Sequence, residues 1–432
     1  MTWLQRFQVR HFFRHSTWIF PTFSLLAALL MVRITYALDL LLALENNLEP
    51  EALRTILGIL AGSLFTVVVF VCSAILIAVQ LASAQLTPRI IALVFRDPTT
   101  KLSLALFVFI FTFSLAVLIR VKTTVPLICA SLSVYGFMLC LIVFLYLVDH
   151  LGRSLRPSGA LRIVGLLGTR VIEEVYSRQH DESSQRRTDA EIGVAGNPSR
   201  ILASDRNGAV LAFDVLGLRD LAHRTECVIE MVPQVGDFVT IGSPLFRIYG
   251  GKTELTADLL CHSVAIGQER TFQQDPTLAF RIMVDVASKA LSPAINDPTT
   301  AVLALDQIHH ILRNVGGRCL DDERVRDASG RLRLIYRTPD WDAFVHLAAT
   351  EIRHFGAQSI QIARRLRAML EDLIESLPRE RVPLLQQELQ LLDRSVKRFF
   401  PEPEDRALAD VGDLQGVGGA QEESAPPNRT SS

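Results

Sequence analysis

The sequence predicts an α-helical integral membrane domain with four transmembrane helices, followed by a cytoplasmic α+β region made of a small β module and a helical bundle. Three observations lead to this fold class. Four long apolar runs lie within the first 150 residues, short strand-like runs follow residue 200, and amphipathic helical patterns extend to residue 400. Apolar residues make up 49% of the 432-residue chain, which fits a protein that is part membrane and part soluble.

The predicted organisation has six segments. They are a basic interfacial arm (1–17), the four-helix transmembrane domain (18–150), an amphipathic helix with a linker (151–200), the β-rich module (201–255), a helical domain (256–400) and a disordered tail (401–432). The tail is assigned from its content of Gly, Glu, Ser and Pro. In the arm, Arg6, Arg10 and Arg14 stand among aromatic residues, and Trp18 is expected at the level of the lipid headgroups.

The four apolar spans cover about residues 18–44, 56–88, 102–119 and 125–148, and each is long enough to cross a bilayer. Lys and Arg gather in the arm, in the loop between the second and third spans, and after the fourth span, whereas the first loop is acidic. Because positive residues mark cytoplasmic loops, both termini are predicted to be cytoplasmic. The sequence therefore predicts a multi-pass protein whose first partner is the lipid bilayer.

The second span carries regularly spaced polar residues. Thr66, Ser73 and Gln80 recur every seven positions, and Thr87 continues the series. Seven residues are close to two helical turns, so these side chains share one helix face. Small residues at four-residue spacing, which let membrane helices approach closely, occur in the same span: Gly58, Gly62, Ala74, Ala78 and Ala82. Either this polar stripe packs against other helices of the same subunit, or it faces an oligomer axis or an aqueous path.

Composition and motifs exclude several classes of protein. The net charge of −1 argues against a general nucleic-acid-binding protein. The six cysteines have neither metal-ligand nor redox spacing, and we predict no cofactor and no metal site. The stretch 235–248 resembles half of a barrel-sandwich domain that carries biotin or lipoate, but residues 201–251 contain no Lys for attachment. No phosphate-binding loop, dinucleotide fingerprint or nucleophile elbow occurs, so catalysis has no positive support.

Two patterns in the predicted helical domain are candidates for a site. Arg281, Asp285 and Lys289 are four residues apart, which puts them on one helix face as a salt-bridge ladder or as ligands of an anion. In the turn that follows, Asp297-Pro298 is a typical helix start. The polar residues of that turn form either a helix cap or a contact for a ligand or another subunit: Ser292, Asn296, Asp297, Thr299 and Thr300.

Two motifs resemble those of a known family. One is the segment QLASAQLTPR at residues 80–89, followed by Arg96-Asp97; the other combines Arg270-Thr271, Gln274-Asp275 and the segment LSPAINDPTTA at residues 291–301. They resemble the bacterial predicted membrane proteins grouped as domain of unknown function 2254, over roughly residues 15–400. The resemblance implies an integral protein of the bacterial inner membrane with a cytoplasmic domain. It implies no catalytic residues, because that family has no assigned activity.

These features lead to three hypotheses for function. The first is a homo-oligomeric channel-, transporter- or sensor-like assembly, with the second span at its core, a regulatory cytoplasmic domain and an unknown small ligand. The alternative is a membrane-anchored binding or scaffold module without conduction. The third is a membrane-bound enzyme with an unrecognised site near Arg281, Asp285 and Asn296. A conducting protein should turn the polar stripe toward an axis, a scaffold should bury it within one subunit, and an enzyme should show a pocket around residues 292–300.

Overall fold

The computed structural model describes residues 2–16, 18–42, 49–89, 97–121, 126–154, 156–180, 196–251, 255–320 and 323–418. The chain divides into two compact units. The membrane unit is Gln8–Ala160, and the second unit combines Met1–Phe7 with Leu161–Ser432.

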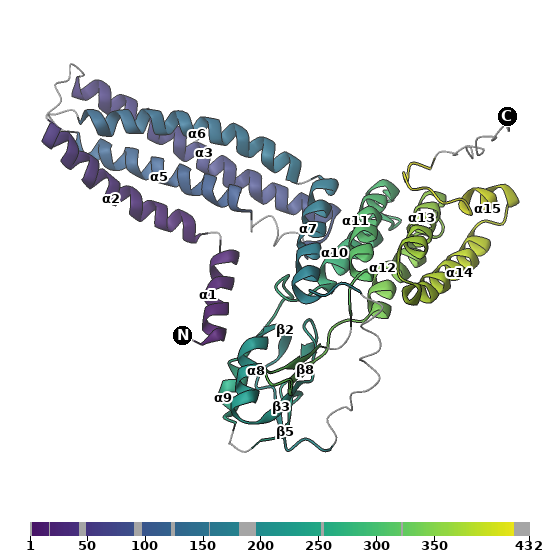
Figure 1. The fold of residues 1–432 in the computed structure, drawn as a ribbon. Helices are drawn as coiled ribbons and strands as arrows, with labels where there is room; N and C mark the ends of the chain where they lie inside the picture. Colours follow the sequence, from purple (N-terminus) through teal and green to yellow (C-terminus); the bar gives the residue numbers. More distant parts are fainter. Residues whose placement is uncertain are drawn as a thin grey trace, which may run out of the picture. The chain divides into compact units, whose positions relative to one another are not determined.

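Four helices of the membrane unit run alongside one another (Figure 1). They are α2 (Ile19–Leu42), α3 (Pro50–Gln85), α5 (Pro98–Arg120) and α6 (Leu127–Ser154), and they follow the N-terminal helix α1 (Trp3–His15). Each of the four is long and apolar enough to cross a bilayer, which confirms the prediction of four transmembrane helices within the described part of the chain. Two clusters of buried side chains hold them together, one around Phe113 and one around Phe107.

Carboxylates cap two of these helices. Asp97 precedes α5 and accepts a hydrogen bond from the Thr100 amide at 3.0 Å. Asp39, within α2, accepts hydrogen bonds from the amides of Ile128 and Cys129 at 2.7 and 3.1 Å. These amides belong to the first turn of α6, where free N–H groups and the helix dipole favour an anion. The acidic residue in the first apolar span therefore caps a neighbouring helix.

The strands described in the second unit form two sheets. Their orders are β1-β5-β3-β8-β7 and β4-β2-β6. All pairs are antiparallel except β3 with β8, where Ile229 lies opposite Leu334. Both residues are buried in the core of this β module, which the helices α8 (Val215–Arg224) and α9 (Ala257–Cys261) accompany. The strands are β1 (Arg200–Ala203), β2 (Gly208–Phe213), β3 (Cys227–Met231), β4 (Phe238–Val239), β5 (Pro244–Gly250), β6 (Val264–Gly267), β7 (Glu323–Arg326) and β8 (Leu332–Tyr336).

In the described residues of the second unit, six long helices, a one-turn 3-10 helix and the short helix α15 (Pro403–Ala409) form the helical part. The helix α10 is buried almost all round, with Phe280 and Met283 fully inaccessible to solvent. The ring of Phe280 contacts that of Phe344, which in turn contacts Tyr176. The helices are α7 (Pro157–Val175), α10 (Thr277–Ala290), α11 (Pro298–Gly316), α12 (Trp341–Gly356), α13 (Ile360–Ser376), η2 (Arg379–Arg381) and α14 (Val382–Phe399).

Two predicted boundaries need correction. Residues 256–400, predicted as helical, also contribute β6, β7 and β8 to the sheets. The tail predicted to be disordered from residue 401 contains the helix α15 (Pro403–Ala409). The residues after α15 fold onto α13, because the buried guanidinium of Arg364 donates to the carbonyls of Val411 and Gly418, both at 3.1 Å. Residues 419–432 of that tail lie outside the described part of the chain.

The first turns of α1 contact the β module. Three apolar side chains of α1 pack on a cluster of small and branched residues of β2 and β6: Trp3, Leu4 and Phe7 on Ala209, Leu211 and Ala265. Farther along α1, Phe12 and Phe13 are exposed. An interfacial location for that part of the arm stays a prediction.

Candidate functional site

The polar stripe of α3 is exposed on the surface of the membrane unit. Thr66, Ser73 and Gln80 all have exposed side chains. The opposite face of α3 carries the residues that pack within the unit: Leu53, Leu57, Leu64, Val71, Ile75 and Val79. This exposure favours the alternative in which the stripe faces an oligomer axis or an aqueous path, which stays a prediction. Thr87 does not continue the stripe, since it is only 5% exposed.

The two series of small residues in α3 lie on different faces. A Cβ atom added to Gly58 or Gly62 would meet nothing within 4 Å, and both glycines are exposed. Ala78 and Ala82 are only 6% and 4% exposed. At 100° per residue, the two glycines share the face of the polar stripe, whereas the two alanines face the unit's interior. One side of α3 thus combines exposed glycines with exposed hydroxyl and amide groups.

Arg281 on α10 joins two helices. Its guanidinium donates to Asp285 Oδ1 at 2.7 Å and makes two hydrogen bonds to the carboxylate of Glu351 on α12, at 2.6 and 2.7 Å. These bonds lower the pKa of Glu351 and raise that of Arg281. The contact is therefore present above the ordinary pKa of a Glu and is lost as pH falls through the lowered value. Lys289 lies one turn beyond Asp285 on the same helix.

The turn between α10 and α11 satisfies its own polar groups. Asp297 accepts hydrogen bonds from the amide and the hydroxyl of Thr300, at 3.1 and 2.6 Å. Ser292 donates to the Lys289 carbonyl at 2.7 Å, and Asn296 is exposed with a left-handed backbone, φ 48°. The carboxylate already accepts from the Thr300 amide, one of the free amides that an anionic ligand would use. This geometry supports the helix cap, and a ligand or subunit contact at the turn stays a prediction.

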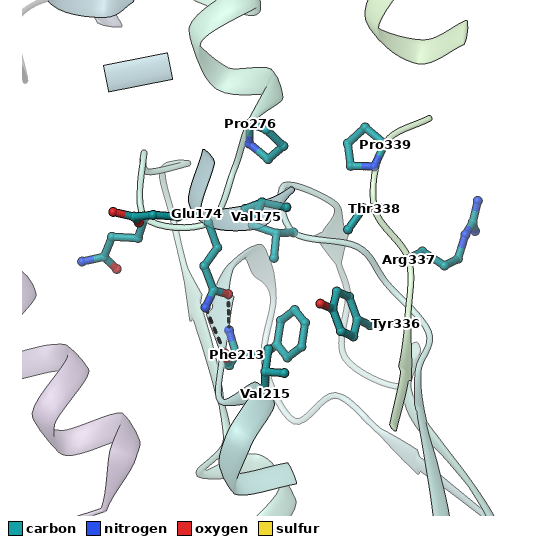
Figure 2. A pocket seen from close by; sticks show the side chains of 12 residues that line it. Glu174, Val175, Phe213, Val215, Pro276, Tyr336, Arg337, Thr338 and Pro339 are labelled. Carbon is teal, nitrogen blue, oxygen red and sulfur yellow. Dashed lines mark hydrogen bonds between the residues drawn. The ribbon is translucent and has the colours of Figure 1, made fainter. Parts of the chain in front are cut away.

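A cavity of about 210 Å³ lies elsewhere in the second unit (Figure 2). Five chain segments line it: the end of α7, the β2–α8 junction, the loop before β4, the loop before α10, and the link between β8 and α12. Its lining residues are Glu174, Val175, Phe213, Val215, Val235, Gln273, Gln274, Pro276, Tyr336, Arg337, Thr338 and Pro339.

Sequence reasoning missed this cavity, although the motif at Gln274-Asp275 pointed to one wall of it. The Gln274 amide accepts from the backbone N–H of Phe213 at 3.0 Å and donates to its carbonyl at 3.1 Å. The buried carboxylate of Asp275 is held by two hydrogen bonds from Arg270, at 2.6 and 2.8 Å, and caps α10 through the Leu278 amide. The motif therefore fixes the loop before α10 against β2 and shapes the cavity.

The chain is similar to membrane proteins without an assigned function. Residues 14–372 match the model of a family described as predicted membrane protein, DUF2254. Uncharacterized proteins of Mycobacterium bovis and Mycobacterium tuberculosis are 25% identical over 425 residues, which covers 94% of this chain and 80% of theirs. No solved structure matches the chain. The matched range contains the four apolar helices and every residue that lines the cavity.

Proposed function

Because the chain belongs to the family of predicted membrane proteins grouped as domain of unknown function 2254, we propose that it is a homo-oligomeric membrane assembly of channel, transporter or sensor type. In this proposal the exposed face of α3 lies between subunits. The second unit is its cytoplasmic regulatory domain, both termini are cytoplasmic, and the membrane is the bacterial inner membrane.

One observation carries the proposal: the face of α3 with Thr66, Ser73 and Gln80 points away from the chain's own bundle. The carboxamide of Gln80 has donors and an acceptor that hydrocarbon cannot satisfy, so a partner helix or water is favoured there. Gly58 and Gly62 allow a second backbone to come close on the same face. Interhelical hydrogen bonds in membranes average only about 0.6 kcal/mol, so other contacts between subunits must contribute.

Disulfide cross-linking tests this interface. Single cysteines at positions 66, 73 and 80, in a chain whose native Cys72 is replaced by Ser, should form covalent dimers in membranes treated with a mild oxidant. Leu81→Cys is a matched control, since Leu81 is 52% exposed but lies about 100° around the helix from Gln80. Ile75→Cys, on the buried face, should stay monomeric. Equal cross-linking at 80 and 81, or none at 66, 73 and 80, would contradict the proposal.

The same variants separate the channel hypothesis from the scaffold hypothesis. If α3 lines a water-filled axis, cysteines at 66 and 73 should react with a small water-soluble thiosulfonate. If the interface is dry, they should cross-link without reacting, and the binding or scaffold module becomes the better description. At Arg281 the hydrogen bonds to Asp285 and Glu351 support a structural role more than the enzyme hypothesis.

A further inference from the structure

One histidine of the second unit lies between two charged side chains of a neighbouring helix. His309 is on α11, which packs beside α13 (Figure 1). Its Nε2 lies 2.8 Å from Asp372 Oδ2, and its Nδ1 lies 3.3 Å from Arg365 Nη2, both on α13. Arg365 also donates from Nε to Asp306 Oδ1 of α11, at 2.8 Å. The His309 side chain is only 14% exposed, so its ring makes a largely buried contact between the two helices.

The chemistry of the two partners fixes the position of the proton on the ring. An arginine side chain is always charged and can only donate, so Nδ1 of His309 must be the acceptor in the contact with Arg365. Nε2 then carries the hydrogen and donates it to Asp372, which makes the ring a neutral imidazole. A second proton on Nδ1 would place one N–H against another, and the hydrogen bond from Arg365 would be lost.

The guanidinium of Arg365 depends on this acceptor. The residue is only 3% exposed, and its Nη1 is already buried without a partner in the described part of the chain. Loss of the contact with His309 would remove the acceptor of Nη2 as well. Buried donors without an acceptor destabilise a fold, and charged donors do so most strongly. Protonation of the ring therefore acts on Arg365 and, through it, on the packing of α11 against α13.

The surroundings of the ring oppose its protonation. Burial lowers the pKa of His309 below its ordinary value of 6.5, and the positive charges of Arg365 and Arg313 act in the same direction. The carboxylate of Asp372 acts in the opposite direction but does not outweigh them. The neutral ring is therefore the form that the folded chain favours.

The other elements packed near α11 carry charged groups that are bonded elsewhere. Arg281 of α10 bonds to Glu351 of α12, and Arg353 of α12 bonds to Glu388 of α14 at 3.2 Å. In the tail, Asp413 accepts from amides of its own loop. The described hydrogen bonds of the ring are those with α13.

We propose that His309 forms an acid-sensitive contact in the second unit: when its ring takes up a second proton, Arg365 loses its acceptor and α11 loosens from α13. The folded chain resists this proton, whereas the unfolded chain does not. The contact therefore stabilises the fold fully above the ordinary histidine pKa of 6.5, and this stabilisation is lost as the pH falls from that value toward the lowered one. The inference goes beyond the proposed assembly and does not depend on it, because both helices belong to the second unit.

Hydrogen exchange of the purified full-length protein, read by mass spectrometry at about pH 7.5 and about pH 5.5, tests this contact. His309→Gln keeps a donor and an acceptor in one side chain but takes up no proton. For residues 303–313 of α11, the ratio of the native exchange rate to that of His309→Gln should rise about threefold between the higher and the lower pH. His310→Gln is the matched control, since His310 is the next residue and is exposed, and this variant should keep the native pH response.

Two results would overturn the proposal: the same pH response in the native chain and in His309→Gln, or loss of the response in His310→Gln. Circular dichroism checks that each variant is folded. If His309→Gln is not folded, the native chain decides. After correction for the intrinsic pH dependence of exchange, α11 should then lose protection at the lower pH relative to β5, which carries no histidine. An equal change in α11 and β5 would contradict the proposal.

Discussion

Asp297 and Pro298 start α11, and the carboxylate meets the amide and hydroxyl of Thr300 at 3.1 and 2.6 Å. Replacing this residue tests whether the turn is structural. Asp297→Ala should lower the free energy of unfolding by about 0.5–2 kcal/mol, because an amide of the first turn loses its acceptor. Asn and Ser side chains can also cap a helix, so Asp297→Asn and Asp297→Ser should keep most of the stability that Asp297→Ala loses. Thermal unfolding of the full-length protein, followed by circular dichroism, gives the comparison.

Equal stability of the three Asp297 variants would refute the capping role.

The turn also shows what a sequence can reveal at the scale of single residues. Asp followed by Pro is a local signal, so the cap could be predicted without knowing any tertiary contact. The partner of Arg281 could not, because Glu351 is 70 residues away and reaches α10 only through the packing of α12.

The residues that follow α15 are hydrogen-bonded to α13 through Arg364. Asp413, only 2% exposed, accepts hydrogen bonds from the amides of Gln415, Gly416 and Gly418 at 3.0, 3.0 and 2.8 Å. Asp413→Ala should destabilise the protein by about 1–3 kcal/mol, because buried donors are left without an acceptor. In the same Asp413→Ala variant, the backbone amides of residues 411–418 should exchange their hydrogens faster.

A neighbouring carboxylate provides the control for this prediction. Asp410 accepts from Arg367 at 3.0 Å but its side chain is 53% exposed, and such surface pairs contribute about 1 kcal/mol or less. If Asp410→Ala and Asp413→Ala had the same effect on exchange, the Asp413 loop would not be what holds residues 411–418 on α13.

Elements with a strong local signal could be predicted, and those that depend on distant partners could not. The apolar spans are visible because a bilayer needs about 20 apolar residues in a row. The strand β8 was not predicted, although β7, its antiparallel partner, lies only a few residues before it; its other partner, β3, lies about a hundred residues earlier in the chain. The tail looked disordered by composition, yet the buried side chains of Arg364 and Arg367 bind its carbonyls. In α3 the seven-residue period was plain, but only the structure shows which face it occupies.

For the whole molecule, the orientation in the membrane is the property to measure next. Glu51 in the first turn of α3 and Glu375 on α13 are both exposed. If the second unit is cytoplasmic, Glu51→Cys should react with an impermeant maleimide in intact cells, whereas Glu375→Cys should react only after the membrane is opened. The unsubstituted chain reports the background from the six native cysteines. The reverse pattern would place both termini outside and overturn the proposed orientation.

The length of α3 has a consequence for the lipid around the protein. Its 36 residues extend about 54 Å at 1.5 Å per residue, well beyond a hydrocarbon core of about 30 Å. The helix must therefore tilt or project from the bilayer, and Thr66 and Gln80, about 21 Å apart along its axis, lie at different depths. A thicker bilayer surrounds more of the stripe with hydrocarbon, so a hydrogen-bonding partner for the Gln80 carboxamide becomes more favourable. Acyl-chain length then becomes a variable that tunes how firmly two copies of α3 associate.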